Sequence, residues 1–458
     1  MLTYELTKAP GLPLYEALYR CIREDILSGT LQPGEKLPSK RALAANLEVS
    51  KITVENAYNQ LLSESYIRSV EKVGYFVEKV ERPLPVHLDL EECPAAEVPA
   101  IDLTANNPAQ FPFSVWSRLQ REVMRDLGQT LLQPLPNQGL AALRKAIARH
   151  LAQFRGMRVR PEQILVGAGT DFLYNLLIQL LGREKRYAVE EPGYNKIRRI
   201  YAAAGATCVD AVMDSQGVCP EHLADADILH ISPSHHFPTG LVTPLSRRQE
   251  LLAWAKQRPD RWIIEDDYDS EFRFAAHPMP TLQSLDSGRV IYMNTFSKTL
   301  APSIRISYMV LPMPLMEQLQ EKLGFYSCTV PSFEQHTLAR FLDEGNFEKH
   351  INRMRRFYKS RRNRLMAAIA ACPGRAYLSV LEENAGLHFL LRVQTAESDE
   401  ELVARCRDIG VQVRALSSYY SVAVPDWAKR CLVINYSGLT DQQIEALEEK
   451  FAILFPAF

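Results

Sequence analysis

The sequence lacks the features that mark membrane, secreted and metal-binding proteins. No apolar run approaches the roughly eighteen residues that a helix needs to cross a bilayer, and residues 1–10 do not form a secretory signal. The eight cysteines show neither CxxC pairs nor metal-ligand spacing. We therefore expect reduced thiols, a cytoplasmic location, no metal and no membrane partner. The formal net charge of −1 excludes a global attraction to nucleic acid, so only local charge placement can supply one.

The chain is long enough for more than one core. At 458 residues, with 47% hydrophobic and 23% charged residues, it has the composition of a globular protein of two or three domains. Prolines and acidic residues crowd residues 81–100 without an apolar period, which predicts a semi-extended linker. We expect one domain over residues 1–80 and another over residues 101–458.

The first 80 residues predict three helices followed by a hairpin. Apolar residues at every fourth position indicate a first helix that ends near Ser28-Gly29. These residues are Leu14, Leu18, Ile22 and Ile26. Ser39 and Ser50 are typical N-caps for a second and a third helix, and two strand-like runs lie within residues 66–77. This order of elements is that of a winged helix-turn-helix, which binds double-stranded DNA.

The predicted third helix offers an exposed polar face that suits a major groove. Basic side chains would neutralise phosphates, hydroxyls would add contacts, and a glycine would let the wing approach the minor groove. The candidate DNA-binding residues are Ser39, Arg41, Ser50, Lys51, Thr53 and Gly74. Residues 1–80 hold ten basic and ten acidic residues, so affinity should depend on two modules presented by a dimer. The alternative is a helical protein-interaction domain.

From Ile101 onward, short apolar runs alternate with longer helical stretches. The runs expected to form strands are Ile164–Val166, Tyr187–Val189, Ile228–Ile231, Trp262–Ile264 and Val290–Met293. This alternation predicts an α/β fold with a parallel sheet, in which ligands bind at the carboxyl ends of the strands. Beyond about Ser332, a long basic helix and further short strands predict a smaller α+β domain. The basic run over residues 353–364 is expected to be the solvated face of that helix.

Four segments place reactive or polar residues after predicted strands. They are Gly167–Asp171, Glu190–Tyr194, Glu265–Tyr268 and Asn294–Lys298. The first offers backbone amides and a helix dipole to a phosphate, and an acid in the third can pair with a pyridinium nitrogen. A desolvated lysine offers a neutral amine that condenses with an aldehyde. Lys298, with Thr295, Ser297 and Arg305 beside it, therefore predicts a site for pyridoxal 5'-phosphate.

The chain resembles two known protein families. Leu37–Ala44, Val49–Tyr58 and Gly74–Val77 resemble the GntR family of bacterial repressors, although Glu48 stands where that family usually has glycine. The order of the four later segments resembles fold-type I aminotransferases. From about Leu12 to the end, the chain resembles the MocR/GabR-type regulators, which fuse the two. Further matching positions are Arg144, Pro238-Thr239-Gly240 and Ala385-Gly386-Leu387-His388.

The resemblance implies a role for each site residue and a homodimer. Lys298 would form the internal aldimine with the cofactor, and Asp266 would face the pyridinium nitrogen. Tyr268 would contact the ring hydroxyl, and Tyr194 would stack on the ring. The phosphate would be held by Gly169, Thr170, Ser297 and Arg305.

The chain departs from the aminotransferase pattern where a substrate would be held. Phe237 replaces the asparagine before the Pro-Thr-Gly turn, and the partner-subunit tyrosine is missing from residues 133–137. Val433 stands where an arginine usually grips the substrate carboxylate, and Arg430 is out of register. A bidentate arginine is hard to replace, although Lys196 offers a point charge nearby. His235 and His236, near the same turn, are expected to be structural.

These departures favour sensing over turnover. The leading hypothesis is a pyridoxal-phosphate-dependent transcriptional regulator that senses an amine, an amino acid or pyridoxal phosphate itself through Lys298, with at most residual transaminase activity. One alternative is an aminotransferase with an appended DNA-binding arm. Another is a DNA-binding protein whose aminotransferase fold has lost its cofactor and serves only dimerisation.

Overall fold

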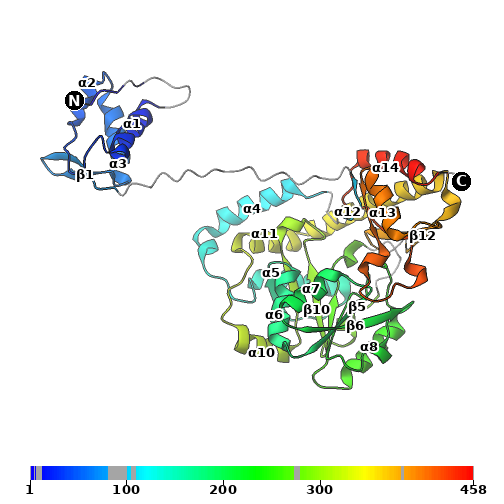
Figure 1. The fold of residues 1–458 in the computed structure, drawn as a ribbon. Helices are drawn as coiled ribbons and strands as arrows, with labels where there is room; N and C mark the ends of the chain where they lie inside the picture. Colours follow the sequence, from blue (N-terminus) through cyan, green and yellow to red (C-terminus); the bar gives the residue numbers. More distant parts are fainter. Residues whose placement is uncertain are drawn as a thin grey trace. The chain divides into compact units, whose positions relative to one another are not determined.

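The structure is a computed structural model in which two units can be described. The described residues are 2–4, 6, 13–80, 101–104, 110–272, 279–382 and 386–456. The first unit lies within residues 1–96 and the second within residues 97–458 (Figure 1). Leu12, Ala385 and the linker predicted over residues 81–100 lie outside the described residues. Within the described ranges, no helix is both long enough and apolar enough to cross a membrane.

The first unit consists of three helices and an antiparallel hairpin, in the predicted order (Figure 1). Its elements are α1 (Leu14–Ser28), α2 (Lys40–Asn46), α3 (Lys51–Ser63), β1 (Ile67–Val70) and β2 (Gly74–Val77). Of the apolar face predicted for α1, Leu18, Ile22 and Ile26 are buried and pack with Tyr58 of α3 in one core, whereas Leu14 is half-buried. Helix α1 ends at Gly29, whose φ of 80° is the left-handed conformation that glycine adopts without strain.

The second unit is built on an eight-stranded sheet with the order β4-β11-β10-β9-β8-β5-β6-β7. The strands are β4 (Ile164–Gly167), β5 (Arg186–Glu191), β6 (Thr207–Asp214), β7 (Gly217–Val218), β8 (Ile228–Ile231), β9 (Trp262–Asp266), β10 (Val290–Thr295) and β11 (Ser307–Val310). The five predicted strands run in one direction, whereas β11 is antiparallel to both of its neighbours. Residues 296–306 between β10 and β11 contain no crossover helix, and so short a connection returns the chain antiparallel.

Helices cover both faces of this sheet. They are α4 (Phe113–Leu127), α5 (Ala141–Arg155), α6 (Thr170–Leu181), α7 (Asn195–Ala203), α8 (Leu245–Lys256), α9 (Leu282–Leu285), α10 (Met313–Leu323) and α11 (Ser332–Asp343). Successive residues of β11 alternate between the faces: Tyr308 and Val310 join the core that includes Leu143 of α5, and Met309 joins the core that includes Leu177 of α6. Because both faces of the sheet are covered by apolar contacts, polar residues gather at the ends of its strands.

A smaller α+β part follows, as expected. Its elements are α12 (Asn346–Ala371), β12 (Leu378–Leu381), β13 (His388–Val393), α13 (Asp399–Asp408), β14 (Val411–Gln412), β15 (Arg414–Ala415), β16 (Cys431–Asn435) and α14 (Asp441–Leu454), and β14 pairs with β3 (Ile101–Asp102). The basic run on α12 is only partly the expected solvated face. Arg353, Arg356 and Lys359 are exposed, but Arg361 is buried, with its guanidinium 4.0 Å from the ring centre of Phe357.

A buried ion pair joins the end of α5 to the end of β9. Arg155 Nη2 lies 2.6 Å from Asp267 Oδ2, and the two side chains are 8% and 0% exposed. Tyr292 Oη donates a second hydrogen bond to the same carboxylate over 2.7 Å. Because each buried charge needs a partner, this pair fixes the backbone that follows β9.

Replacing Arg155 with methionine should lower the free energy of unfolding of the second unit by about 3–5 kcal/mol, because Asp267 would keep a buried charge without its partner. Urea denaturation followed by tryptophan fluorescence isolates this unit, since Trp116, Trp254, Trp262 and Trp427 all belong to it.

The matched control is Arg125→Met. Arg125 and Asp126 also form an ion pair, 2.8 Å long, but their side chains are 73% and 37% exposed. An exposed pair contributes less than about 1 kcal/mol. Equal losses of stability in the two variants would contradict the role given to burial.

Candidate functional site

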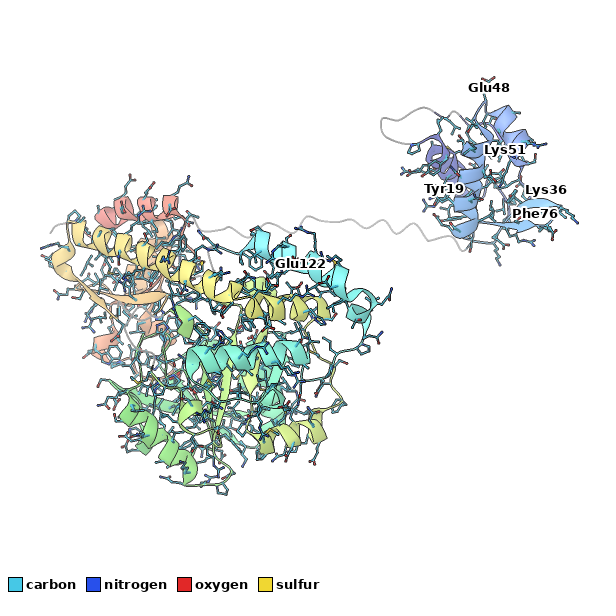
Figure 2. All side chains as sticks on the ribbon, turned by 180° about the vertical axis from the view of Figure 1, so that it is seen from behind. Tyr19, Lys36, Glu48, Lys51, Phe76 and Glu122 are labelled. Atoms are coloured by element: carbon cyan, nitrogen blue, oxygen red, sulfur yellow. The ribbon has the colours of Figure 1, made fainter. Side chains whose placement is uncertain are left out.

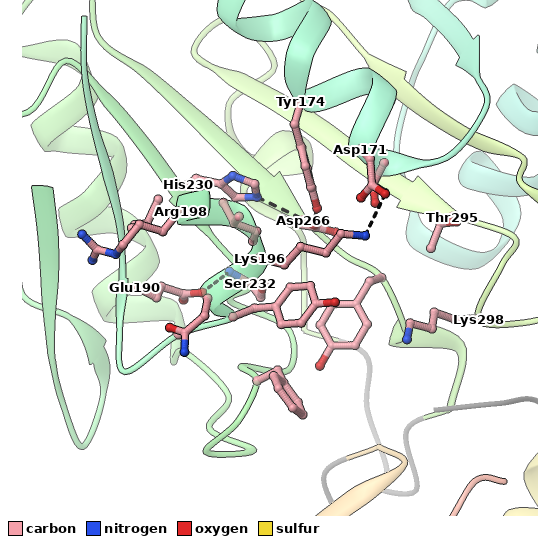
Figure 3. A pocket seen from close by; sticks show the side chains of 18 of the residues that line it. Asp171, Tyr174, Glu190, Lys196, Arg198, His230, Ser232, Asp266, Thr295 and Lys298 are labelled. Carbon is pink, nitrogen blue, oxygen red and sulfur yellow. Dashed lines mark hydrogen bonds and ion pairs between the residues drawn. The ribbon is translucent and has the colours of Figure 1, made fainter. Parts of the chain in front are cut away.

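A cavity of about 390 Å³ at the carboxyl ends of the central strands brings the four predicted segments together (Figure 3). Seven predicted site residues line it: Thr170, Tyr194, Asp266, Tyr268, Ser297, Lys298 and Arg305. Gly169, the remaining predicted residue, lies directly beside the Arg305 guanidinium. The strands are far apart in the sequence, but their ends meet at one edge of the sheet, and this places the segments around one cavity.

Lys298 follows β10 and is partly buried in the cavity wall. Burial lowers the pKa of its amine below the ordinary value, and the charges of Asp269 and Asp266 oppose that shift. Lys196 adds to the lowering, since it is a like charge close by. The amine therefore loses its proton at a lower pH than an exposed lysine, as a nucleophile toward an aldehyde must.

Asp266, the last residue of β9, is buried and held from two sides. Tyr174 Oη donates a hydrogen bond to Asp266 Oδ2 over 2.5 Å, and His230 Nε2 lies 3.6 Å from the same oxygen (Figure 3). Among the described residues, Asp266 Oδ1 has no hydrogen-bond partner although it is buried. A buried carboxylate oxygen that lacks a donor fits the N–H of a pyridinium ring.

Tyr174 and His230 were not predicted from the sequence, although signals for both were present. Tyr174 lies one helical turn after Thr170, so the two share a face of α6. His230 is a polar residue inside the otherwise apolar strand β8. Tyr201 Oη lies 2.6 Å from His230 Nδ1 and continues the chain of polar contacts away from Asp266.

The turn before α6 forms a cradle that fits a phosphate. Gly169 has a φ of 89°, and a Cβ at this position would come within 2.2 Å of Arg305 Nη2. Helix α6 begins at Thr170, so its free amides face the turn. Ser297 Oγ is buried and lacks a hydrogen-bond partner among the described residues. Backbone amides, a hydroxyl and a guanidinium are the donors that phosphate oxygens require.

The residue at the position expected for the carboxylate-binding arginine is apolar and lies outside the cavity lining. Val433 is 3% exposed and packs in a cluster with Tyr419, against which Phe237 also lies. Arg430 does not line the cavity; it lines a separate surface groove with Trp427. The nearest rim cations are ion-paired: Lys196 with Asp171 at 2.7 Å, and Arg198 with Glu191 at 3.4 Å and with Asp210.

His235 and His236 are buried and do not line the cavity. His235 Nδ1 lies 2.7 Å from Asp269 Oδ2, and His236 Nδ1 lies 2.7 Å from Thr239 Oγ1. Both rings thus have partners within the fold, as expected for structural histidines. Burial lowers the pKa of His236 to about 3, so this ring is neutral.

The helix-turn-helix residues take the predicted positions in the first unit. Ser39 Oγ accepts from the Ala42 amide and Ser50 Oγ from the Thr53 amide, so both serines cap helices. Arg41, Lys51, Asn56 and Asn59 are exposed, as is the apolar Ile52, whereas Thr53 and Gly74 are partly buried. Figure 2 labels the side chains of Lys51 and Glu48 in this unit.

Two acidic residues of the helix-turn-helix, Glu48 and Glu55, have local explanations. Glu48 has a φ of 54°, which explains why glycine is usual at this turn. Glu55 forms an ion pair with Lys40 at 2.8 Å, so its charge on the side of α3 is compensated. Neither acid therefore disturbs the local fold, and the net charge of the module remains near zero.

A winged helix-turn-helix joined to an aminotransferase-like fold with a lysine at its strand-end cavity defines a class of bacterial regulator. Residues 14–77 match the family of bacterial regulatory proteins called gntR, and residues 98–451 match aminotransferase class I and II. The chain belongs to the MocR/GabR-type subfamily of GntR transcriptional regulators, whose members are HTH-type regulators with an aminotransferase-like domain.

Individual relatives agree with this assignment. The chain is 38% identical over 451 residues to the uncharacterized HTH-type transcriptional regulator YhdI of Bacillus subtilis, covering 96% of this chain and 95% of that protein. It is 34% identical to the pyridoxine biosynthesis regulator PdxR of Corynebacterium glutamicum, covering 87% of each. A kynurenine aminotransferase of Pyrococcus horikoshii shares the fold, with a TM-score of 0.67 and 24% identity over 78% of this chain and 90% of that one.

Asp269→Asn should lower the pKa of Lys298 further, because the carboxylate that stabilises the ammonium form is removed. Cyanate modifies the neutral amine, so the pH at which modification of Lys298 becomes fast should fall by up to about one pH unit relative to the wild type. Mass spectrometry of the Lys298 peptide follows the modification. Asp225→Asn, at a residue with a 77% exposed side chain outside the cavity lining, should leave the profile unchanged. A shift of the modification profile of Asp269→Asn toward higher pH would contradict the predicted lowering of the Lys298 pKa.

Proposed function

We propose that the chain is a DNA-binding regulator that holds pyridoxal phosphate at Lys298 and senses an amine, an amino acid or pyridoxal phosphate itself. The observation that carries this proposal is the presence in one cavity of a lysine with a lowered pKa and the free, buried Asp266 Oδ1. Neither feature serves the packing of the fold, because each costs stability unless a ligand engages it.

When bound, pyridoxal phosphate supplies an aldehyde that reacts with amines and a ring that withdraws electrons. Asp266 would accept the ring N–H, with Tyr174 holding the carboxylate in place. Tyr268 would contact the ring hydroxyl as a neutral phenol, since burial raises its pKa well above the ordinary value. Tyr194, half exposed at the rim, would stack on the ring. The phosphate would be held by Gly169, Thr170, Ser297 and Arg305.

Sensing is favoured over turnover by the contrast between the two ends of the cavity. Most of the residues that would hold the cofactor line the cavity, whereas Val433, which replaces the expected carboxylate-binding arginine, packs in an apolar cluster outside the cavity lining. A carboxylate that enters without a bidentate cation loses hydration that nothing replaces. An aminotransferase with an appended DNA-binding arm is the alternative, and steady conversion of an amino donor and a keto acid by the full chain would support it.

Effector control further requires that the full chain adopt two arrangements with different affinity for the effector. We propose a homodimer that presents two helix-turn-helix modules to one operator, because a module without net positive charge binds DNA weakly alone. Effector binding at Lys298 would favour one arrangement and so change how the modules meet the DNA.

Lys298→Ala should abolish cofactor that borohydride fixes covalently to the protein, because no amine remains at the strand end to react with the aldehyde. Peptide mass spectrometry after borohydride treatment provides the measurement. Lys256→Ala, at a 62% exposed lysine of α8, is the control and should retain the fixed cofactor. Cofactor still fixed in the Lys298 variant would refute the assignment.

Replacing Arg41 and Lys51 together with alanine should weaken binding to a duplex of about 40 base pairs and flatten its salt dependence. The slope of log affinity against log salt should fall by roughly 0.9 for each phosphate that the variant no longer neutralises. Arg20→Ala, at an exposed residue of α1 paired with Glu16, should leave the slope unchanged. If the double variant keeps the wild-type slope, these residues do not contact phosphates.

A further inference from the structure

An acidic residue lies inside the phosphate cradle. Asp171 is in the first turn of α6, directly after Thr170. Its Oδ2 accepts a hydrogen bond from Lys196 Nζ over 2.7 Å, and it lies 3.5 Å from Arg305 Nη2 (Figure 3). All three side chains line the cavity. One carboxylate oxygen therefore engages two cations at the place where the phosphate would be held.

This contact reduces the positive charge available to a phosphate. The cradle offers the N-terminus of α6 and the cations of Arg305 and Lys196, and a phosphate monoester near neutral pH brings between one and two negative charges. Asp171 cancels one unit of that positive charge and competes for the same guanidinium. Asp171 also pairs with Lys196, so that Lys196 is not free to bind an effector carboxylate.

The geometry indicates a moderate effect on affinity. The side chains of Asp171, Lys196 and Arg305 are 36%, 48% and 50% exposed, so solvent weakens their interaction with one another and with a ligand. A charge-assisted contact in this setting changes affinity by about tenfold. A residue of this kind adjusts how tightly the phosphate is held without preventing its binding.

We infer that Asp171 sets the affinity of this site for the phosphate group, holding pyridoxal phosphate weakly enough to exchange with the surrounding pool. This inference rests on the proposed function, since it concerns the same cofactor site. A sensor responds to a ligand only when its dissociation constant lies near the ligand concentration. A permanently held catalytic cofactor imposes no such limit, so the acid in the cradle suits a regulator better than an enzyme.

The experiment compares pyridoxal phosphate with pyridoxal, which lacks the phosphate, in titrations of the full chain followed by absorbance. Asp171→Asn should tighten the binding of pyridoxal phosphate about tenfold, because Lys196 and Arg305 are released to the phosphate. The affinity for pyridoxal should change by less than about twofold, since no phosphate meets the cradle. Lys196→Met should act in the opposite direction and weaken pyridoxal phosphate more than pyridoxal, since only the phosphorylated ligand loses a cation at the cradle, while the change at the Lys298 amine affects both ligands.

Asp210→Asn is the matched control, because Asp210 pairs with the rim residue Arg198 but does not itself line the cavity. It removes the same charge and should leave both affinities unchanged. If Asp171→Asn binds pyridoxal phosphate no more tightly than the wild type, or if its affinity for pyridoxal rises by the same factor, the role given to Asp171 is wrong. The proposed function would stand in either case. A wild-type protein that binds neither compound would overturn the proposed function itself.

Discussion

The buried carboxylates at the end of β9 and directly after it are the constraint on which the second unit depends. Glu265 forms an ion pair with Arg248 and accepts hydrogen bonds from the backbone amides of Leu282 and Gln283. Burial raises the pKa of Glu265 to about 7. The next three acids have partners from other elements: Asp266 pairs with Tyr174 of α6, Asp267 with Arg155 of α5, and Asp269 with His235. Because unpaired buried charge is so costly, these contacts fix α5, α6 and α8 against one strand end. The candidate site is formed where those elements meet.

Within this framework, the two ends of the cavity have different chemistry. Toward the phosphate cradle and the ring nitrogen, buried donors and acceptors stand ready for a ligand, as Ser297 Oγ and Asp266 Oδ1 show. At the position expected to bind a carboxylate, Val433 packs in an apolar cluster and offers no cation, and the rim cation Arg198 is already paired with Glu191 and Asp210. A site that keeps the means to bind a cofactor but not the means to grip a carboxylate suits a domain that reports on a ligand to a DNA-binding module.

Much of the fold could be predicted because periodicity and capping act locally. The four-residue spacing of Leu18 and Ile22 indicated α1, and Ser39 and Ser50 cap the helices that they were expected to cap. The antiparallel strand β11 was not predicted, because its direction depends on the length of a connection rather than on the strand's own residues. Arg361 was expected to be solvated and is buried, because it lies between Tyr358 and Leu365 on the single stripe of buried residues along which α12 packs.

The order of residues along the chain already specifies the chemistry of the site: a lysine after one strand, an acid after another, and a glycine turn before a helix. Which groups act on these residues depends on the folded arrangement. Tyr174 meets Asp266 across 92 positions of sequence, and Arg305 meets Asp171 across the cavity. Motifs are local, so the sequence displays them directly. Hydrogen bonds and charge pairing depend on distances of a few ångströms in space, and those are set only when the strands are aligned in one sheet.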